Sequence, residues 1–361
     1  MHRAAYAEID LAALRHNLRQ VRWFAGESKV MCVIKANAYG HGLLQVAEAL
    51  SQSDGFAVAC VDEAIALRNR GITQTITVFQ GFLDQSELAA CAEHSLWPVL
   101  HDQTQLLILE QAAITKPLRV WLKLSSGMNR LGFAAQQAQE LWRQLQAIDG
   151  IEQIGLMTHM ASADEGKGDV DVTTTQIQSF QQHTATLEAE RSLANSATLI
   201  AWPEARADWV RPGIMLYGAS PFIPDIEDGE TLQLRPVMRL ASCLISIHQR
   251  RQDDLVGYGG IWHCPEDMPV GVVAIGYGDG YPRHVDDTAT VLVNGSYAPI
   301  IGRVSMDLLT VDLRGIEAQV GDEVTLWGEG LPVDEIAASA DTIAYELLCG
   351  VYGRVEYRYR E

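Results

Sequence analysis

Short apolar runs alternate with amphipathic segments over the first two thirds of this 361-residue chain. The apolar runs have the length and composition of buried strands, and the segments between them repeat apolar residues every three or four positions, as helices do. Such alternation favours a parallel sheet, because parallel strands are joined by helical crossovers. The expected strands lie at residues 30–36, 55–61, 75–81, 96–102, 119–125, 154–160, 192–197 and 209–218, and clear helical patterns lie at 43–53, 61–71, 141–149 and 177–190.

The number of repeats narrows the fold class. About eight strand–helix units in roughly 230 residues fit a (β/α)8 barrel of the TIM type better than an open sheet, and a doubly wound sheet is the alternative. After Pro236 the pattern changes to alternating strands separated by glycine-rich turns, with one helical pattern at residues 333–349. We therefore expect a barrel domain over residues 1–233 and a mainly β domain over 234–361.

Charge and cysteine usage exclude several classes of protein. The net charge of −19 disfavours nucleic acid and anionic membranes as partners, because both require a basic surface. No segment is apolar enough to span a bilayer, and the N-terminus lacks the apolar core of a signal peptide. The six cysteines form no CxxC pair, so we expect reduced, mostly buried thiols, no metal site and a cytoplasmic location.

A lysine ends the first expected strand, in the sequence MCVIKANAYGHG at residues 31–42. In a barrel the chemistry takes place at the carboxyl ends of the strands. Burial lowers the pKa of a lysine amine and makes it a better nucleophile, able to form a Schiff base with a carbonyl. Lys35 taken alone is equally consistent with a salt-bridged lysine at a strand end.

Other expected strands also end in functional residue types. Ser196 and the backbone N–H groups at Gly213 and Ile214 follow the last two strands, where barrels often bind phosphate. A lysine, a phosphate site and an arginine at one barrel mouth suit pyridoxal 5′-phosphate (PLP). The residues expected at this mouth are Lys35, Lys123, Arg130, His159, Asn195, Ser196, Arg211, Gly213 and Ile214.

Motifs along almost the whole chain resemble those of the PLP-dependent alanine racemase family. They are KANAYGHG at 35–42, SSGMNRLGF at 125–133, THMASADE at 158–165, NSA at 195–197, RPGIMLYG at 211–218, VGYGGIW at 256–262, AIGYGDGYPR at 274–283 and GRVSMD at 302–307. The resemblance implies interconversion of L-alanine and D-alanine. It also implies a homodimer joined head to tail, in which each active site takes residues from both chains.

The resemblance implies two bases on opposite faces of the substrate Cα. Lys35 holds PLP and, once released, acts as the base for D-alanine, while Tyr258 of the partner subunit acts for L-alanine. A phenol with a pKa near 10 is a poor base unless neighbouring groups tune it. Arg211 corresponds to the arginine that faces the pyridine nitrogen, and His159 packs beside the ring and supports it.

The resemblance also implies phosphate contacts from Tyr39, Ser196, Gly213 and Ile214. The family often has a tyrosine directly before the arginine of its C-terminal RV motif, but here Gly353 stands there and Tyr352 precedes it. Tyr352 is therefore a candidate replacement. A histidine that supports the catalytic tyrosine in some members is replaced by Ser192.

The remaining implied roles concern the substrate. Arg130 lies near the substrate carboxylate, and Lys123 corresponds to a lysine that is carbamylated in some members. Met306 and Asp307 of the second subunit form the carboxylate site, with the Met306 N–H as donor. Asp164, Arg283 and Arg303 correspond to charged residues of the substrate corridor.

Three alternatives remain at the level of sequence. A broader-specificity or serine racemase differs only in accepting one more hydroxyl, a discrimination that is often modest. A PLP-dependent decarboxylase on a similar barrel should lack the GYGDGYPR and SMD motifs. A non-catalytic PLP carrier should lack the β domain and Tyr258, since a carrier needs no second base. The physiological direction, D-alanine supply for peptidoglycan or alanine catabolism, is left open.

Overall fold

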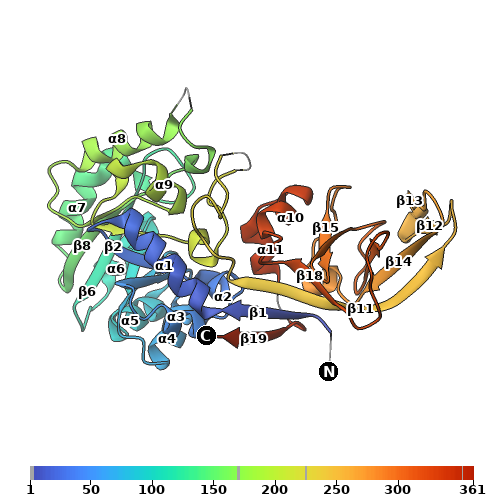
Figure 1. Cartoon of the computed structure of the whole chain (residues 1–361). Helices are drawn as coiled ribbons and strands as arrows, with labels where there is room; N and C mark the ends of the chain where they lie inside the picture. Colours follow the sequence, from blue (N-terminus) through green and yellow to red (C-terminus); the bar gives the residue numbers. More distant parts are fainter. Residues whose placement is uncertain (1–3, 169–170, 224–225, 352) are drawn as a thin grey trace.

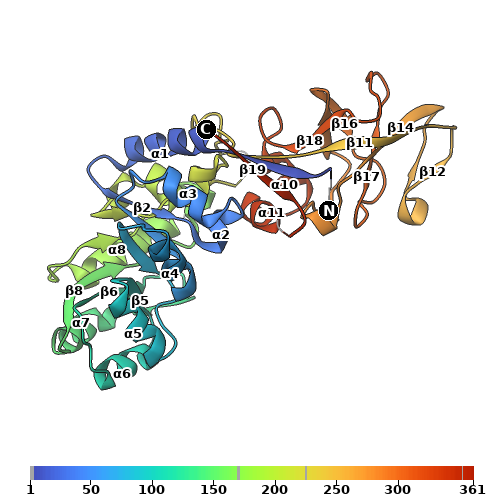
Figure 2. The same cartoon turned by 90° about the horizontal axis from the view of Figure 1, so that it is seen from below.

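The computed structural model describes residues 4–168, 171–223, 226–351 and 353–361. The chain folds into two parts that lie end to end, and the long strand β11 (Met238–Arg250) runs from the barrel side into the second part (Figure 1). A view turned by 90° shows the same elongated arrangement (Figure 2).

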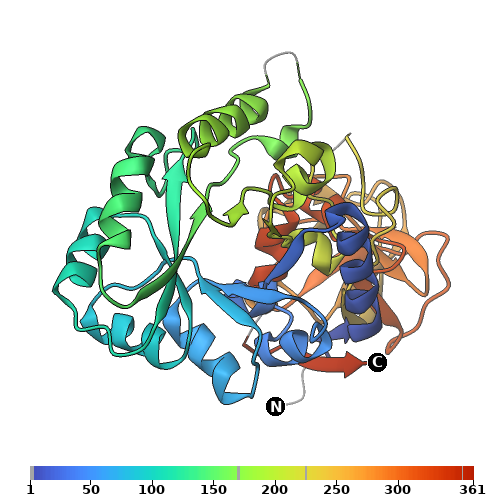
Figure 3. The same cartoon turned by 90° about the vertical axis from the view of Figure 1, so that its left-hand side faces the viewer.

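The first part is a closed parallel barrel, as the sequence predicts (Figure 3). The pairing of Val99 with Trp121 joins the two ends of the strand order, and Trp209 pairs with Lys29 on the other side. Within the described residues, the barrel strands are β2 (Lys29–Val33), β3 (Gly55–Val58), β4 (Thr75–Val78), β5 (Trp97–Leu100), β6 (Leu118–Ser125), β8 (Ile151–Met157), β9 (Arg191–Ser192) and β10 (Trp209–Val210), with the short β7 (Phe133–Ala134) paired to β6.

Helices cover the outside of the barrel, and several of them begin at a residue whose side chain caps the helix (Figure 3). Asp84 accepts hydrogen bonds from the Ser86 and Glu87 N–H groups at the start of α5, and Asn195 accepts from Thr198 N–H at the start of α9. The helices are α1 (Leu11–Ala25), α3 (Leu43–Ala49), α4 (Val61–Asn69), α5 (Gln85–Glu93), α6 (Gln103–Gln111), α7 (Ala138–Gln146), α8 (Val172–Thr184) and α9 (Ser196–Ala201), with the short helical turns η1 (Ala135–Gln137), η2 (Ala163–Glu165), η3 (Pro203–Ala205) and η4 (Ile214–Tyr217). The segment labelled α2 (Lys35–Tyr39) is a left-handed turn and not a right-handed helix.

The second part is mainly β, again as predicted. Its central strand β11 pairs antiparallel with β14 and β18, and two helices pack on the side that faces the barrel (Figure 1). The elements are β12 (Leu255–Val256), η5 (Tyr258–Gly260), β13 (Trp262–His263), β14 (Met268–Val273), η6 (Tyr277–Asp279), β15 (Thr290–Val293), β16 (Ser296–Pro299), β17 (Leu309–Asp312), β18 (Glu323–Trp327), α10 (Val333–Ser339), α11 (Ala344–Gly350) and β19 (Glu356–Arg360).

The N-terminal strand also belongs to this second sheet. Strand β1 (Tyr6–Asp10) pairs antiparallel with β11 and parallel with β19. One strand from the N-terminal side of the chain is therefore part of the C-terminal sheet. The division at residues 233 and 234 itself stays a prediction.

Most of the expected barrel strands are shorter than the sequence pattern suggests, and those expected at 55–61, 75–81 and 96–102 contain four residues each. The first ends at Val33, before Lys35, and the last two contain two residues each. Pro212 has no N–H to donate to a strand ladder, and the chain after it forms the short helix η4 instead. None of the helices in the described part of the chain is long and apolar enough to cross a membrane. Cys32, Cys91 and Cys264 are buried, whereas Cys349 is exposed.

Candidate active site

Lys35 lies at the carboxyl end of the barrel, two residues beyond β2. It begins a turn in which Ala36, Asn37, Ala38 and Tyr39 all have positive φ angles, between 51° and 55°. Such a left-handed turn costs roughly 1–2 kcal/mol per residue for amino acids other than glycine. The chain must therefore hold it in place with other contacts.

Side chains stabilise this left-handed turn at both ends. Glu63 Oε1 accepts from the Ala36 N–H at 2.8 Å, and Asn37 Oδ1 accepts from the Leu43 N–H at 2.9 Å. His41 is fully buried, and its Nδ1 lies 2.9 Å from the Tyr39 carbonyl oxygen. Burial lowers the pKa of His41 to about 4, so the ring is neutral near pH 7 and Nδ1–H can donate to the turn.

The turn brings Tyr39 to the residues that follow the last two strands. A Cβ added to Gly213 would lie 2.7 Å from the Tyr39 hydroxyl oxygen, so only glycine leaves this space open. The Gly213 N–H donates to Ser196 Oγ at 2.9 Å. Tyr39 stacks on Tyr217, with ring centroids 4.8 Å apart, which fixes the direction of its hydroxyl. Tyr39, Ser196 and Gly213 thus form a small cradle of hydrogen-bonding groups at the barrel mouth, beside Ile214 and Asn195.

Four cationic side chains meet beside this cradle. Burial, followed by the charges of Arg211, Arg130 and Lys35, lowers the pKa of Lys123 to about 8. Burial and the charge of Arg130 also lower the pKa of Lys35. A lysine with a lowered pKa has more of its free amine available near neutral pH, which is the form that acts as nucleophile and base.

Arg211 is buried and is held by several acceptors. It donates from Nη1 to Ser192 Oγ at 2.7 Å and from Nη2 to the Thr158 carbonyl oxygen at 2.7 Å. Its Nη2 also lies 3.3 Å from His159 Nδ1. Burial and the neighbouring charge of Arg211 keep the pKa of His159 well below its usual value, so this ring is a neutral acceptor. Burial lowers the pKa of Arg211 only to about 10, and it stays protonated near pH 7.

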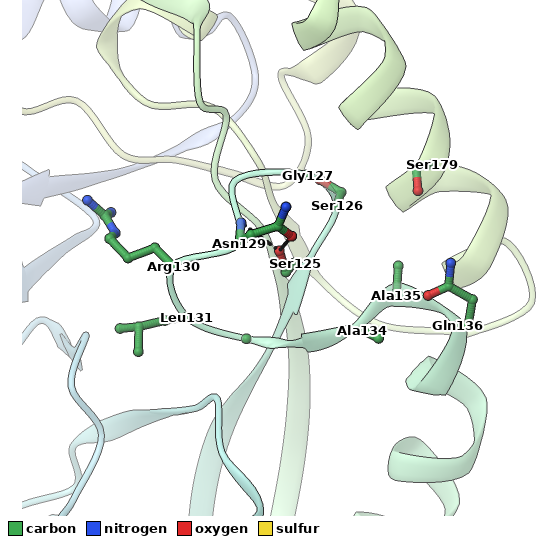
Figure 4. A pocket seen from close by; sticks show the side chains of 11 residues that line it. Ser125, Ser126, Gly127, Asn129, Arg130, Leu131, Ala134, Ala135, Gln136 and Ser179 are labelled. Atoms are coloured by element: carbon green, nitrogen blue, oxygen red, sulfur yellow. Dashed lines mark hydrogen bonds between the residues drawn. The ribbon is translucent and has the colours of Figure 1, made fainter.

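Arg130 extends from the loop that follows β6. This loop, with Asn129 at a φ of 56°, lines a pocket of about 460 Å³ together with residues of η1 and Ser179 of α8. In the close view the Arg130 side chain points away from Ser179, along the other side of the loop (Figure 4). Asp164 is exposed on η2.

The other predicted site residues lie on the second part of the molecule. Tyr258 is 70% exposed and Met306 is 54% exposed. Arg303 Nη1 lies 3.5 Å from the Tyr258 carbonyl oxygen, so these two expected residues are neighbours. Asp307 adjoins Met306, and Arg283 is exposed after η6. Strands β12 and β13, which flank Tyr258, lie at the end of the molecule remote from the barrel (Figure 1). Tyr352 falls outside the described residues.

Sequence reasoning missed several residues that hold this site. Thr158 and Ser192 fix Arg211, and the stacked ring of Tyr217 supports both Tyr39 and His41. The sequence did single out Ser192, because it occupies the position of a histidine in some members of the family that the motifs resemble. Its hydroxyl contacts Arg211. His41 belongs to the KANAYGHG motif, but its contact with the Tyr39 carbonyl oxygen depends on the folded turn and not on spacing along the chain.

A closed barrel with a lysine of lowered pKa at its mouth, followed by a mainly β domain, is compatible with the class of barrel-fold enzymes that use a lysine amine as nucleophile. Two family models match this chain, "Alanine racemase, N-terminal domain" over residues 9–221 and "Alanine racemase, C-terminal domain" over residues 237–359. The chain belongs to the alanine racemase family and is an isomerase.

Individual relatives cover the whole chain. It is 49% identical over 363 residues to the alanine racemase of Coxiella burnetii strain RSA 493, covering 99% of each chain. Its structure is similar to that of the biosynthetic alanine racemase from Pseudomonas aeruginosa, with a TM-score of 0.96, 41% identity and complete coverage of both chains. The alanine racemase from Acinetobacter baumannii gives a TM-score of 0.94 at 38% identity, covering 99% of this chain and 100% of the other.

Proposed function

We propose that this chain interconverts L-alanine and D-alanine with PLP bound at the barrel mouth, using Lys35 and Tyr258 as bases on opposite faces of the substrate. The observation that carries the proposal is the lysine of lowered pKa beside a cradle of hydrogen-bond donors. Family membership supports alanine as the substrate.

The residues at the mouth fit PLP. Lys35 would hold the aldehyde carbon covalently, and Tyr39, Ser196, Gly213 and Ile214 would bind the phosphate. Burial raises the pKa of Tyr39, so its hydroxyl remains a donor to an anion. Asn195 caps the helix that begins at Ser196 and thereby fixes the cradle. When bound, PLP withdraws electrons from the amino acid and acidifies its Cα–H.

Two bases then divide the proton transfers between them. The Lys35 amine would exchange the Cα proton on the side of D-alanine, and the Tyr258 hydroxyl would do so on the side of L-alanine. Arg211 would face the pyridine nitrogen. Because Arg211 stays protonated, it cannot take a proton from that nitrogen, and His159 keeps it in position as a neutral acceptor.

We propose a homodimer with shared active sites, because the two proposed bases lie far apart within a single chain. Tyr258 lies beside β12 at the far end of the second part, whereas Lys35 lies at the barrel mouth (Figure 1). A second copy would bring Tyr258, Met306 and Asp307 to the first copy's barrel.

The substrate carboxylate would be bound by Arg130 and by the Met306 N–H, with Asp307 beside it. Carbamylation of Lys123 would replace a cation by an anion and so relieve its repulsion with Arg130. Asp164, Arg283 and Arg303 would line the substrate corridor. We place the reaction in the cytoplasm, where D-alanine would be supplied for peptidoglycan or alanine would be broken down.

The test is to incubate the holoenzyme with L-alanine and follow both enantiomers by chiral chromatography. An approach to equal amounts supports the proposal, and L-serine measured in parallel decides whether the specificity is broader. A yellow, folded protein that forms no D-alanine would contradict it and favour another substrate or a PLP carrier.

Mixed chains test the shared sites. Lys35→Ala and Tyr258→Phe homodimers are each expected to be nearly inactive. A heterodimer of the two variants should regain up to about half of the activity, because one of its two sites has both bases. Absence of recovery in a verified heterodimer would contradict the assignment of Tyr258 to the partner's site.

A further inference from the structure

Arg354 connects the loop that carries Met306 and Asp307, two proposed substrate-binding residues, to a neighbouring loop. It lies between α11 and β19, in the C-terminal segment of the chain. Its Nη2 lies 2.6 Å from Asp307 Oδ1 and 3.3 Å from the Met306 carbonyl oxygen. Its Nε lies 3.0 Å from the Gly278 carbonyl oxygen and 2.9 Å from Asp279 Oδ1. One guanidinium thus binds both the loop at 276–281 and the loop at 305–307.

The backbones of these loops are also joined directly. The Tyr277 N–H donates to the Ser305 carbonyl oxygen at 3.1 Å, and the Gly278 N–H donates to the Met306 carbonyl oxygen at 2.8 Å. A Cβ on Gly278 would lie 2.4 Å from Arg354 Nη2. The glycine therefore leaves the space that the guanidinium occupies.

These contacts fix the peptide groups on both sides of Met306. The Ser305 carbonyl oxygen, which shares a peptide group with the Met306 N–H, accepts from Tyr277 N–H, and the Met306 carbonyl oxygen of the next peptide group accepts from both Gly278 N–H and Arg354 Nη2. Among the residues that the structure describes, the Met306 N–H donates to no protein acceptor, and the residue is exposed. This donor is consequently held in a set direction and is free to bind a ligand.

We infer that Arg354 is a positioning residue, which orients the Met306 N–H toward the substrate carboxylate in the barrel mouth of the partner subunit. The inference rests on the proposed function. Within the described residues, the hydrogen bonds and ion pairs of Arg354 go to the two loops and to none of the barrel groups proposed to hold PLP. Its loss should therefore weaken carboxylate binding and leave cofactor binding unchanged.

The first experiment uses Arg354→Gln holoenzyme. We expect KM for L-alanine to rise by roughly tenfold while kcat changes by less than about threefold, the size expected for losing charge-assisted hydrogen bonds. Arg354→Lys should recover part of the loss. Arg314→Gln is the matched control, because Arg314 binds Asp312 and Glu266 in the same part of the molecule but neither loop.

A second readout does not depend on turnover. Acetate, used as a carboxylate probe and measured by titration calorimetry, should bind the Arg354→Gln holoenzyme roughly tenfold more weakly than the unaltered one. The visible absorbance of bound PLP should stay the same. Gly278→Ala should act in the same direction, because its methyl group displaces the guanidinium without removing its charge. Unchanged acetate affinity in a folded Arg354→Gln protein would overturn the inference, even if the enzyme proves not to racemise alanine.

Mixed chains again show where the residue acts. In a heterodimer of Arg354→Gln and Lys35→Ala chains, only one of the two sites has Lys35, which the Arg354→Gln chain supplies. The partner that completes this site is the Lys35→Ala chain, whose Arg354 is intact. The KM of this site should return to the unaltered value. A KM that stays raised would place the effect of Arg354 within its own chain and overturn the inference.

Discussion

Burial, followed by the charges of Arg211, Arg130 and Lys35, lowers the pKa of Lys123 to about 8. The folded protein binds this proton less tightly than the unfolded chain, whose lysine has a pKa near 10.5. The protonated amine therefore destabilises the fold below about pH 8, and the penalty disappears as the pH rises through 10.5. In bicarbonate-free buffer at pH 7, Lys123→Gln should raise the melting temperature by on the order of 2 °C.

Bicarbonate tests the proposed carbamylation at the same residue. Addition of bicarbonate at pH 8 should raise the melting temperature of the unaltered protein, because a carbamate removes the repulsion among the cations. The Lys123→Gln protein should not respond. Equal shifts in both proteins would count against a carbamate at Lys123.

Ser192 supports Arg211 from inside the barrel. Ser192→Ala leaves a buried N–H of Arg211 without its acceptor at 2.7 Å. The free energy of unfolding should fall by about 1–3 kcal/mol, measured by urea denaturation. Ser246→Ala, which removes an exposed hydroxyl bonded to His248, should change it much less. A similar loss in both variants would show that the buried arginine does not depend on Ser192.

At the scale of elements, the sequence predicted the order and type of the strands better than their ends. The pattern at residues 30–36 reads as one strand, but the strand stops at Val33 and a left-handed turn follows. Nothing in the local sequence favours positive φ at Ala36 or Ala38. The turn depends on Glu63 and on His41, and spacing along the chain does not reveal such contacts.

The left-handed turn reverses the usual effect of glycine. In a right-handed helix alanine is more stable than glycine by about 1 kcal/mol, as Ala338→Gly in α10 should show. At Ala36, with a φ of 54°, glycine relieves backbone strain instead. Ala36→Gly should therefore leave the free energy of unfolding equal or raise it by up to about 1 kcal/mol in chemical denaturation. A loss as large as that of Ala338→Gly would contradict the account of strain.

For the whole molecule, the sequence predicted the two architectures and the residues grouped at the barrel mouth. It did not predict that β1 would leave the barrel side and pair with β19, because partners some 350 positions apart leave no local pattern. It also missed Arg354, whose role depends on two loops that are distant from it in sequence.

The junction of the two parts contains a buried carboxyl group. Asp334 at the start of α10 faces the Ser220 N–H at 3.4 Å, and burial raises its pKa to about 6, with Asp228 and Glu335 adding to the rise. The folded state binds this proton more tightly than the unfolded chain, so stability from this group is present at low pH and is lost as the pH rises through 6.

Asp334→Asn should therefore stabilise the protein at pH 7 to 8 by roughly 1–2 kcal/mol, with no gain near pH 4. Thermal unfolding across this pH range measures the difference. Glu329→Gln, an exposed carboxylate in the same part of the chain, is the control. A gain that does not depend on pH would exclude titration of Asp334 as its cause.

The pairing of β1 with β19 has a consequence for synthesis of the protein. The first strand to leave the ribosome has a partner that is made last, whereas every strand of the barrel lies between them. The barrel can fold while translation continues, but the second sheet cannot be completed until the chain is released. A chain truncated before β19 would then carry every barrel strand and an unfinished sheet. Since that sheet bears the groups proposed to serve the other subunit, only finished chains could complete each other's sites.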